Sequence, residues 1–228
     1  MLFVGLDDTD NLESRGTGHL ARQIALELAH DYTLLGVVRH QLLVDARVPC
    51  TRHNSCKALI LEADGGIRAA ALMERVAAMV LADFQPDSDP GVCVCSSPPD
   101  AVVQFGQRAK RELLRQSDAR ELAARHGILL AGLAGTQDGV IGALAAVGLA
   151  ASGEDGRYML LGGIRELSGL QPIGAVLAAG VAAVRTMHGE LISDGLVACD
   201  KLRPARRGGQ AVLFVQPEDD HWTPLKLD

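Results

Sequence analysis

The most informative part of the sequence is its beginning, which reads Leu2-Phe3-Val4-Gly5-Leu6-Asp7-Asp8-Thr9-Asp10 and continues to Gly16-Thr17-Gly18. A short apolar run that ends at an aspartate is typical of a buried strand. Residues 18–30 then repeat leucine or isoleucine every four positions, starting at Leu20, which predicts an amphipathic helix. This part of the chain is therefore expected to form a strand, an acidic loop and a helix.

The same reading extends along the rest of the chain and favours a mixed α/β (α+β) fold, because predicted strands and helices alternate. Further strands are predicted at 34–44, 57–62, 91–96 and 128–133, and further helices around 72–80, over 101–116 and from Gly139 onward. In the 101–116 helix, Leu113 is expected to point inward together with Val102, Phe105 and Ala109. The helix that follows Gly139 is apolar all round, which predicts complete burial.

A polar, glycine-rich segment, Ser152-Gly-Glu-Asp-Gly156, suggests a boundary between a domain at 1–156 and a smaller one at 157–228. The second segment predicts a strand at 157–165, a helix at 172–179, and strands near 181–187, 196–199 and 211–215. That order resembles a small ferredoxin-like α+β unit.

Composition bounds the kind of protein. Hydrophobic residues make up 48% of the 228, enough for a sizeable core, yet no apolar run approaches the roughly 18–20 residues that span a bilayer. The chain has five cysteines and no basic leader, so we expect a cytoplasmic protein without a disulfide framework. A net charge of −6 argues against a dedicated nucleic-acid coat.

Three carboxylates in four residues, Asp7, Asp8 and Asp10, repel one another at the end of the first strand. Magnesium relieves such repulsion, since it prefers carboxylate and phosphate oxygens. Gly16 and Gly18 expose amide donors at a helix start, which suits a phosphate. The loop therefore predicts magnesium-dependent phosphoryl chemistry, with Thr17 either receiving a phosphoryl group or capping the helix.

Two alternatives stay open for this loop. It is equally compatible with a solvated turn in which Thr17 acts only as a cap. It is also similar to the opening motif of the haloacid-dehalogenase phosphohydrolases, although Leu12 stands where their motif has Thr or Val.

Three segments in one order resemble the archaeal tRNA agmatidine synthetase family, which attaches agmatine to the wobble cytidine of an isoleucine tRNA. They are Val4–Asp10 followed by Thr17 and Leu20-Ala21, then Val48-Pro-Cys-Thr-Arg-His-Asn54, and Gly139-Val-Ile-Gly-Ala-Leu-Ala-Ala-Val-Gly148. The likeness covers roughly residues 1–165. It implies a kinase-like domain that uses ATP and magnesium, followed by the ferredoxin-like unit.

The resemblance also implies roles for individual residues. Asp7, Asp8 and Asp10 correspond to the metal and nucleotide site, and Thr17 to a threonine that itself receives a phosphoryl group. The residues that would line the nucleotide or face its phosphates or the acceptor are Gly16, Gly18, Thr51, Arg52, Asn54, Gly139 and Gly142.

The sequence departs from the family in ways that bear on function. Cys50 stands where the family has a Trp-Lys pair, so one cation is missing, and Gly16 and Gly18 replace a Cys and a second Thr. The chain stops where the family continues into an OB-fold and a zinc ribbon. Together with the acidic charge, this argues against tRNA binding by this chain alone.

The acceptor, a small molecule or an RNA, is therefore left open, as is a homodimer or a protein partner. A second hypothesis is a nucleotide-sensing or partner-binding module that has lost catalysis. Cys93 and Cys95 are interpreted as buried structural thiols. The basic cluster of Lys201, Arg203, Arg206 and Arg207 is either an anion site or, as charge runs usually are, a solvated loop.

Overall fold

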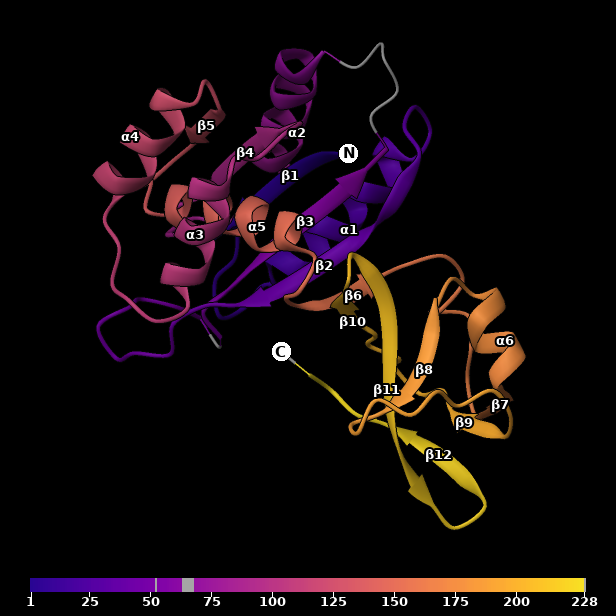
Figure 1. The fold of residues 1–228 in the computed structure, drawn as a ribbon. Helices are drawn as coiled ribbons and strands as arrows, with labels where there is room; N and C mark the ends of the chain where they lie inside the picture. Colours follow the sequence, from indigo (N-terminus) through magenta and orange to yellow (C-terminus); the bar gives the residue numbers. More distant parts are fainter. Residues whose placement is uncertain (52, 63–67, 228) are drawn as a thin grey trace.

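The computed structural model describes residues 1–51, 53–62 and 68–227. Within them, a twelve-stranded sheet is flanked by six helices, which confirms the predicted mixed α/β (α+β) class (Figure 1). The helices are α1 (Thr17–Leu28), α2 (Ala69–Asp83), α3 (Asp100–Ala109), α4 (Gln116–Arg125), α5 (Gly139–Ser152) and α6 (Ile173–Ala178). The first six strands are β1 (Leu2–Asp7), β2 (Leu34–Gln41), β3 (Ser55–Leu61), β4 (Gly91–Cys95), β5 (Leu129–Gly132) and β6 (Arg157–Leu160).

Strand β1 lies inside the sheet, between β3 and β4, and runs antiparallel to both. The strand order here is β5-β4-β1-β3-β2-β6. Leu2, Val4 and Leu6 of β1 pack into a core shared with α1 and α2, whereas Phe3 packs into a second core shared with α3 and α5. Figure 1 shows α3 and α5 on one side of these strands and α1 on the other.

Helix α5 is buried along most of its length, as its uniformly apolar sequence predicts. Its backbone comes unusually close to the sheet, because a Cβ on Gly5 would lie 1.9 Å from the carbonyl oxygen of Ala143. The N-terminal turn of α5 packs equally closely against β4, where a Cβ on Gly91 would lie 2.1 Å from the carbonyl carbon of Gly139. These contacts bring the start of α5 to the end of β1, where the acidic loop begins.

The predicted helix over 101–116 is wrong beyond Ala109. There α3 ends, because the carbonyl oxygen of Ala109 accepts a hydrogen bond from the Leu43 amide at 3.0 Å. Leu113 was expected to point inward but is 44% exposed. A separate helix, α4, begins at Gln116, where the Asp118 carboxylate accepts a hydrogen bond from the Arg115 amide at 2.9 Å and caps the new turn.

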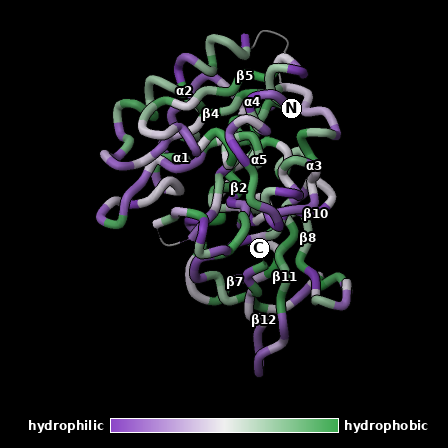
Figure 2. The backbone as a smooth tube through the Cα atoms, turned by 90° about the vertical axis from the view of Figure 1, so that its left-hand side faces the viewer, coloured by the Kyte–Doolittle hydropathy of each residue, from purple (hydrophilic) through white to green (hydrophobic). Residues whose placement is uncertain are grey.

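The remaining strands surround a third apolar core that includes Ile173, Val184 and Leu213. They are β7 (Leu170–Pro172), β8 (Ala183–Thr186), β9 (Leu196–Ala198), β10 (Ala205–Arg207), β11 (Gln210–Glu218) and β12 (His221–Pro224). Helix α6 and strands β6, β8, β9 and β11 overlap the predicted positions, whereas the short strands β7, β10 and β12 were not predicted. In Figure 2 the hairpin that joins β11 to β12 has a hydrophilic tip.

The basic stretch at 201–207 is not simply a solvated loop. Arg206 is buried, and its guanidinium donates hydrogen bonds to the Tyr158 hydroxyl and the Gly209 carbonyl, both at 2.6 Å. Lys201, by contrast, is exposed. In the described part of the chain, no helix combines the length and apolarity needed to cross a membrane.

Candidate functional site

The acidic loop between β1 and α1 folds back, so that Thr17 at its end contacts Thr9 and Asp10 near its beginning. Asp8, which follows β1 directly, adopts a left-handed backbone conformation with φ of 52°, a conformation that aspartate tolerates better than most residues. The Thr17 hydroxyl, at the start of α1, donates a hydrogen bond to Asp10 Oδ1 at 2.5 Å. It also accepts one from the Thr9 amide at 3.2 Å. The two bonds fix the loop around Thr17.

Thr17 does not cap its helix. The residue at the N-cap position of α1 is Gly16, and no side chain there bonds a helix amide. The hydroxyl of Thr17 is committed instead to the loop and to Asp10. The interpretation of Thr17 as a mere cap is therefore wrong, and its hydroxyl is in contact with a carboxylate that could remove its proton.

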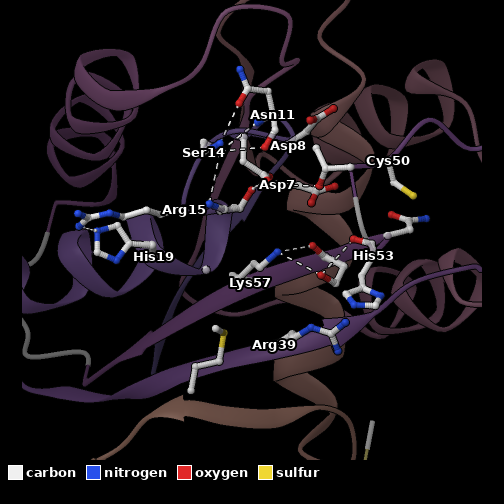
Figure 3. A pocket seen from close by; sticks show the side chains of 18 of the residues that line it. Asp7, Asp8, Asn11, Ser14, Arg15, His19, Arg39, Cys50, His53 and Lys57 are labelled. Atoms are coloured by element: carbon white, nitrogen blue, oxygen red, sulfur yellow. Dashed lines mark hydrogen bonds between the residues drawn. The ribbon is translucent and has the colours of Figure 1, made fainter.

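The loop forms one wall of a cavity of about 280 Å3, which we call cavity 1 (Figure 3). Strands β2 and β3, the start of α1 and residues 49–51 and 53–54 supply the other walls. The predicted site residues that line it are Asp7, Asp8, Asp10, Gly16, Thr17, Gly18, Thr51 and Asn54. His19 and His53 line it as well, whereas Arg52 lies outside the described residues.

Two of these residues brace the cavity. The Thr51 hydroxyl donates a hydrogen bond to Asp10 Oδ2 at 3.1 Å, so both oxygens of Asp10 carry a threonine partner. The Asn54 amide donates to the carbonyl oxygen of Leu43 at 2.9 Å. That bond ties Asn54 to Leu43, so Asn54 has a structural role in addition to its place in the cavity wall.

A buried lysine that the sequence analysis did not select also lines cavity 1. Lys57 lies on β3, and its ammonium donates hydrogen bonds to the carbonyl and hydroxyl oxygens of Ser55 at 2.6 and 3.2 Å. Burial lowers the pKa of Lys57, and the nearby Asp7 carboxylate opposes this effect. The sequence analysis missed Lys57, although a lysine inside the apolar run 55–61 was a signal for it.

The carboxylates at the end of β1 hold protons more tightly than usual. Burial raises the pKa of Asp7 to about 7, and Lys57 partly offsets that rise. Burial raises the pKa of Asp8 to about 6, and repulsion from Asp89 and Asp10 adds to it. Carboxyl groups with raised pKa values at the edge of a cavity are typical of sites that bind cations or move protons.

A second cavity, of about 500 Å3, lies against the same loop and is called cavity 2. Asp7, Asp8, Pro49 and Asn54 line both cavities, so they form the wall between them. Gly139 and Gly142 line cavity 2 rather than cavity 1. Leucine, valine and isoleucine side chains make much of its surface, as an organic ring would require.

Gly142 also leaves space for the acidic wall. A Cβ at this position would lie 1.8 Å from Asp7 Oδ2, so only glycine lets α5 approach the carboxylate. Gly142 therefore has a specific structural role: because it lacks a side chain, the Asp7 carboxylate can lie against α5.

The donor set of cavity 1 suits magnesium and a phosphate chain. Asp8 and Asp10 offer hard carboxylate oxygens, and Lys57, Arg39 and Arg22 of the same lining offer positive charge. Within the described ranges, no three His, Cys, Asp or Glu side chains come together as a metal-binding group. Magnesium is commonly held by only one or two carboxylates plus substrate phosphates.

The fold and the cavity define the class, namely a mixed α/β protein whose first strand ends in a carboxylate loop opposite buried cations. No protein-family model matches the sequence. The tRNA 2-agmatinylcytidine synthetase TiaS of Methanopyrus kandleri, which is named for an isoleucine tRNA, is 32% identical over 155 residues. The match covers 66% of this chain and 34% of that protein.

Solved structures agree on the fold. The complex of TiaS with its isoleucine tRNA and ATP matches with a TM-score of 0.57 at 24% identity, over 64% of this chain and 36% of that chain. A tRNA fluorescent labeling enzyme matches with a TM-score of 0.57 at 24% identity, over 64% and 35%. The complex of TiaS with the same tRNA, AMPCPP and agmatine gives a TM-score of 0.56 at 23% identity, over 64% and 36%.

These matches confirm the resemblance to the tRNA agmatidine synthetase family that the sequence indicates. The chain spans about a third of the length of the relatives it matches. The activity, the substrates and the partners of those longer proteins therefore do not transfer to it directly.

Proposed function

We propose that this protein is an ATP- and magnesium-dependent enzyme that transfers a phosphoryl group or uses ATP to activate an acceptor. The observation that carries the proposal is the bond between the Thr17 hydroxyl and Asp10 in a cavity that also holds Asp7, Asp8 and Lys57. The relatives whose structures contain ATP or AMPCPP support the nucleotide. The acceptor stays open between a small molecule and an RNA.

Thr17 is the proposed first recipient of the γ-phosphoryl group. Its oxygen forms the new bond to phosphorus while the bond between that phosphorus and the β-phosphate oxygen breaks, which releases ADP. Asp10 Oδ1 accepts the hydroxyl proton, since the hydrogen bond at 2.5 Å already points it there. Thr51 holds the other oxygen of Asp10 and so keeps the base in position.

Charge in the cavity divides between its two sides. Asp8 would hold magnesium together with substrate phosphate oxygens, and the bound metal would neutralise those oxygens and align them for transfer. Lys57 and Arg39 face the developing negative charge from the sheet. Asp7, confined between Lys57 and Gly142, positions Asp8 at the wall between the two cavities.

Replacement of Asp8 by asparagine tests the proposal. Asparagine is nearly isosteric and tolerates the left-handed backbone at this position, so the melting temperature should change little. Magnesium-dependent ATP turnover should be lost, while Asp220→Asn, at a highly exposed position near the C-terminus, should retain it. If Asp8→Asn turns over ATP as wild type does, Asp8 has no role in the reaction.

The same assay separates the alternatives. ATP binding without turnover in the wild-type chain would favour the nucleotide-sensing module. Phosphate release from simple phosphomonoesters without ATP would favour the phosphohydrolase. The buried Lys57 weakens the case for a module that has lost catalysis, because the missing cation was part of that case.

A further inference from the structure

A row of positive charges crosses three adjacent strands beside cavity 1. Lys57 on β3 is paired with Arg39 on β2, and Arg39 is paired with Arg157 on β6. Paired residues on neighbouring strands point to the same face, at strand spacings of about 4.8 Å. Three cations therefore share one face over about 10 Å, an arrangement in which like charges repel.

Three more arginines join this row from other parts of the chain. Arg22 comes from α1, Arg165 from the segment after β6, and Arg203 from the turn before β10. Burial and then repulsion from Arg165, Arg157 and Arg22 lower the pKa of Arg203. Burial and repulsion from Arg165 likewise lower the pKa of Arg22. Backbone contacts agree with this placement: the Tyr158 amide on β6 donates a hydrogen bond to the Pro204 carbonyl oxygen at 2.8 Å, which holds the segment with Arg203 beside β6. Arg22 lines cavity 1 together with Arg39 and with Met159 of β6.

Among the described residues, the hydrogen bonds of these three arginines go to main-chain carbonyl oxygens. Arg22 donates to the Gly18 carbonyl at 2.8 Å, Arg165 to the Met159 carbonyl at 3.3 Å and Arg203 to the Leu202 carbonyl at 2.7 Å. Over the described ranges, none of the three has a carboxylate partner. In a chain of net charge −6, such a concentration of arginine calls for an anion.

We propose that Arg22, Arg39, Arg157, Arg165 and Arg203, which we call the arginine cluster, bind phosphate groups of the acceptor. This inference rests on the proposed function, because it names the chemical class of the substrate at the same site. Arg22 and Arg39 line cavity 1, whereas the other three lie beyond its lining. The cluster therefore leads from the reacting groups outward to Arg165, which is exposed.

The extent of the cluster indicates more than one phosphate. A single phosphate is held by one or two guanidinium forks, whereas three arginines here, Arg22, Arg165 and Arg203, have no carboxylate partner among the described residues. The two sources of such a ligand are a small phosphate ester and the backbone of a single-stranded RNA. Both ligands place phosphate oxygens against guanidinium groups, and a competition experiment between them identifies the source.

The test measures binding of a fluorescein-labelled, mixed-sequence RNA octamer to the full chain, without ATP. Arg165→Gln and Arg203→Gln should each weaken binding about tenfold and reduce the slope of log K against log salt by about 0.7. Arg185→Gln is the matched control, because Arg185 is an exposed arginine on β8 that also bonds a main-chain carbonyl. It should change neither quantity.

An octamer with neutral methylphosphonate linkages should not bind, because the contacts are to phosphate charge. Ribose 5-phosphate that displaces the octamer at micromolar concentration would identify a small ester as the source, whereas displacement by RNA alone would identify the backbone. Arg165 is exposed, so Arg165→Gln remains informative if Arg203→Gln fails to fold.

Failure of this inference is distinguishable from failure of the proposed function. If the octamer and ribose 5-phosphate both fail to bind, or if Arg165→Gln and Arg185→Gln behave alike, the acceptor site is refuted whatever the ATP assay shows. An equal loss of ATP affinity in Arg165→Gln would also refute it, since the cluster would then hold the nucleotide. RNA binding without ATP turnover would support the anion site and refute the proposed enzymatic activity.

Discussion

Substitution of Gly142 by alanine should destabilise the protein even though alanine is the better helix former. In an unobstructed helix the change would stabilise by about 1 kcal/mol. Here the new Cβ would lie 1.8 Å from Asp7 Oδ2 and 2.4 Å from Asp7 Cγ, on a half-buried carboxylate that packs against α5. Either α5 or the Asp7 side chain must move, and overpacking of this kind costs about 1–3 kcal/mol.

We therefore expect Gly142→Ala to lower the free energy of unfolding by about 2 kcal/mol. For a chain of this size, that loss corresponds to a melting temperature lower by about 4–8 °C. Thermal and urea unfolding followed by circular dichroism measure both quantities. ATP turnover should fall as well, because Asp7 and the wall it forms would be displaced.

Gly174→Ala on α6 is the matched control, because nothing lies within 4 Å of the Cβ it would add. It should be neutral or stabilising. The double variant Asp7→Ala/Gly142→Ala should lose less stability than the sum of the single variants, since the two nearest clashing atoms are gone. Additive effects, or a Gly142→Ala protein as stable as wild type, would show that Asp7 does not lie under α5.

Three further results are expected. Lys57→Met should raise the pKa of Asp7 further, because a neighbouring buried cation is lost. The same substitution should weaken ATP binding about tenfold, as measured by calorimetry, because that cation would face the phosphates. Unchanged affinity would exclude Lys57 from the site. Among the five free thiols, only Cys50 is exposed, and it lines cavity 1. Ellman's reagent should therefore modify one thiol in the folded protein, and ATP with magnesium should protect that thiol. Modification without protection would place ATP elsewhere. In metal-free protein the folded-state pKa of Asp7, about 7, exceeds its ordinary value of 3.8, so its stabilising contribution is complete below about pH 4 and is lost as pH rises through 7. The resulting loss in the free energy of unfolding approaches about 4 kcal/mol. Asp7→Asn should remove this part of the pH dependence. Parallel curves of stability against pH for the two proteins would contradict the prediction.

Local patterns predicted the elements that carry the site. The apolar run that ends at Asp7 and the apolar stretch from Gly139 indicated β1 and α5, because burial on both faces leaves few alternatives for such residues. The helix over 101–116 was overextended because the bond that ends α3 comes from Leu43, far away in the sequence. Helical periodicity carries no information about such a partner.

The candidate site shows the same division. The loop residues Asp7, Asp8, Asp10 and Thr17 could be selected because they are adjacent in the sequence and chemically unusual together. Lys57 carried only the weak signal of a lysine within an apolar run, and Arg203 only that of a basic stretch. Strand register and chain packing bring these residues to the cavity or its surroundings, and neither can be seen in the sequence. The sequence also could not reveal that Thr17 bonds Asp10, which depends on how the loop closes.

In the proposed reaction, the residues of cavity 1 transfer a phosphoryl group from ATP to Thr17. Incubation of the full chain with magnesium and γ-labelled ATP, followed by tryptic digestion, tests it directly. The peptide Gly16–Arg22 contains Thr17 as its only hydroxyl residue, and a phosphothreonine ester survives acid that removes phosphate from His19. We expect acid-stable label on this peptide, lost in both Thr17→Val and Asp8→Asn. Turnover of ATP with no label there, or label that persists in Thr17→Val, would contradict the account.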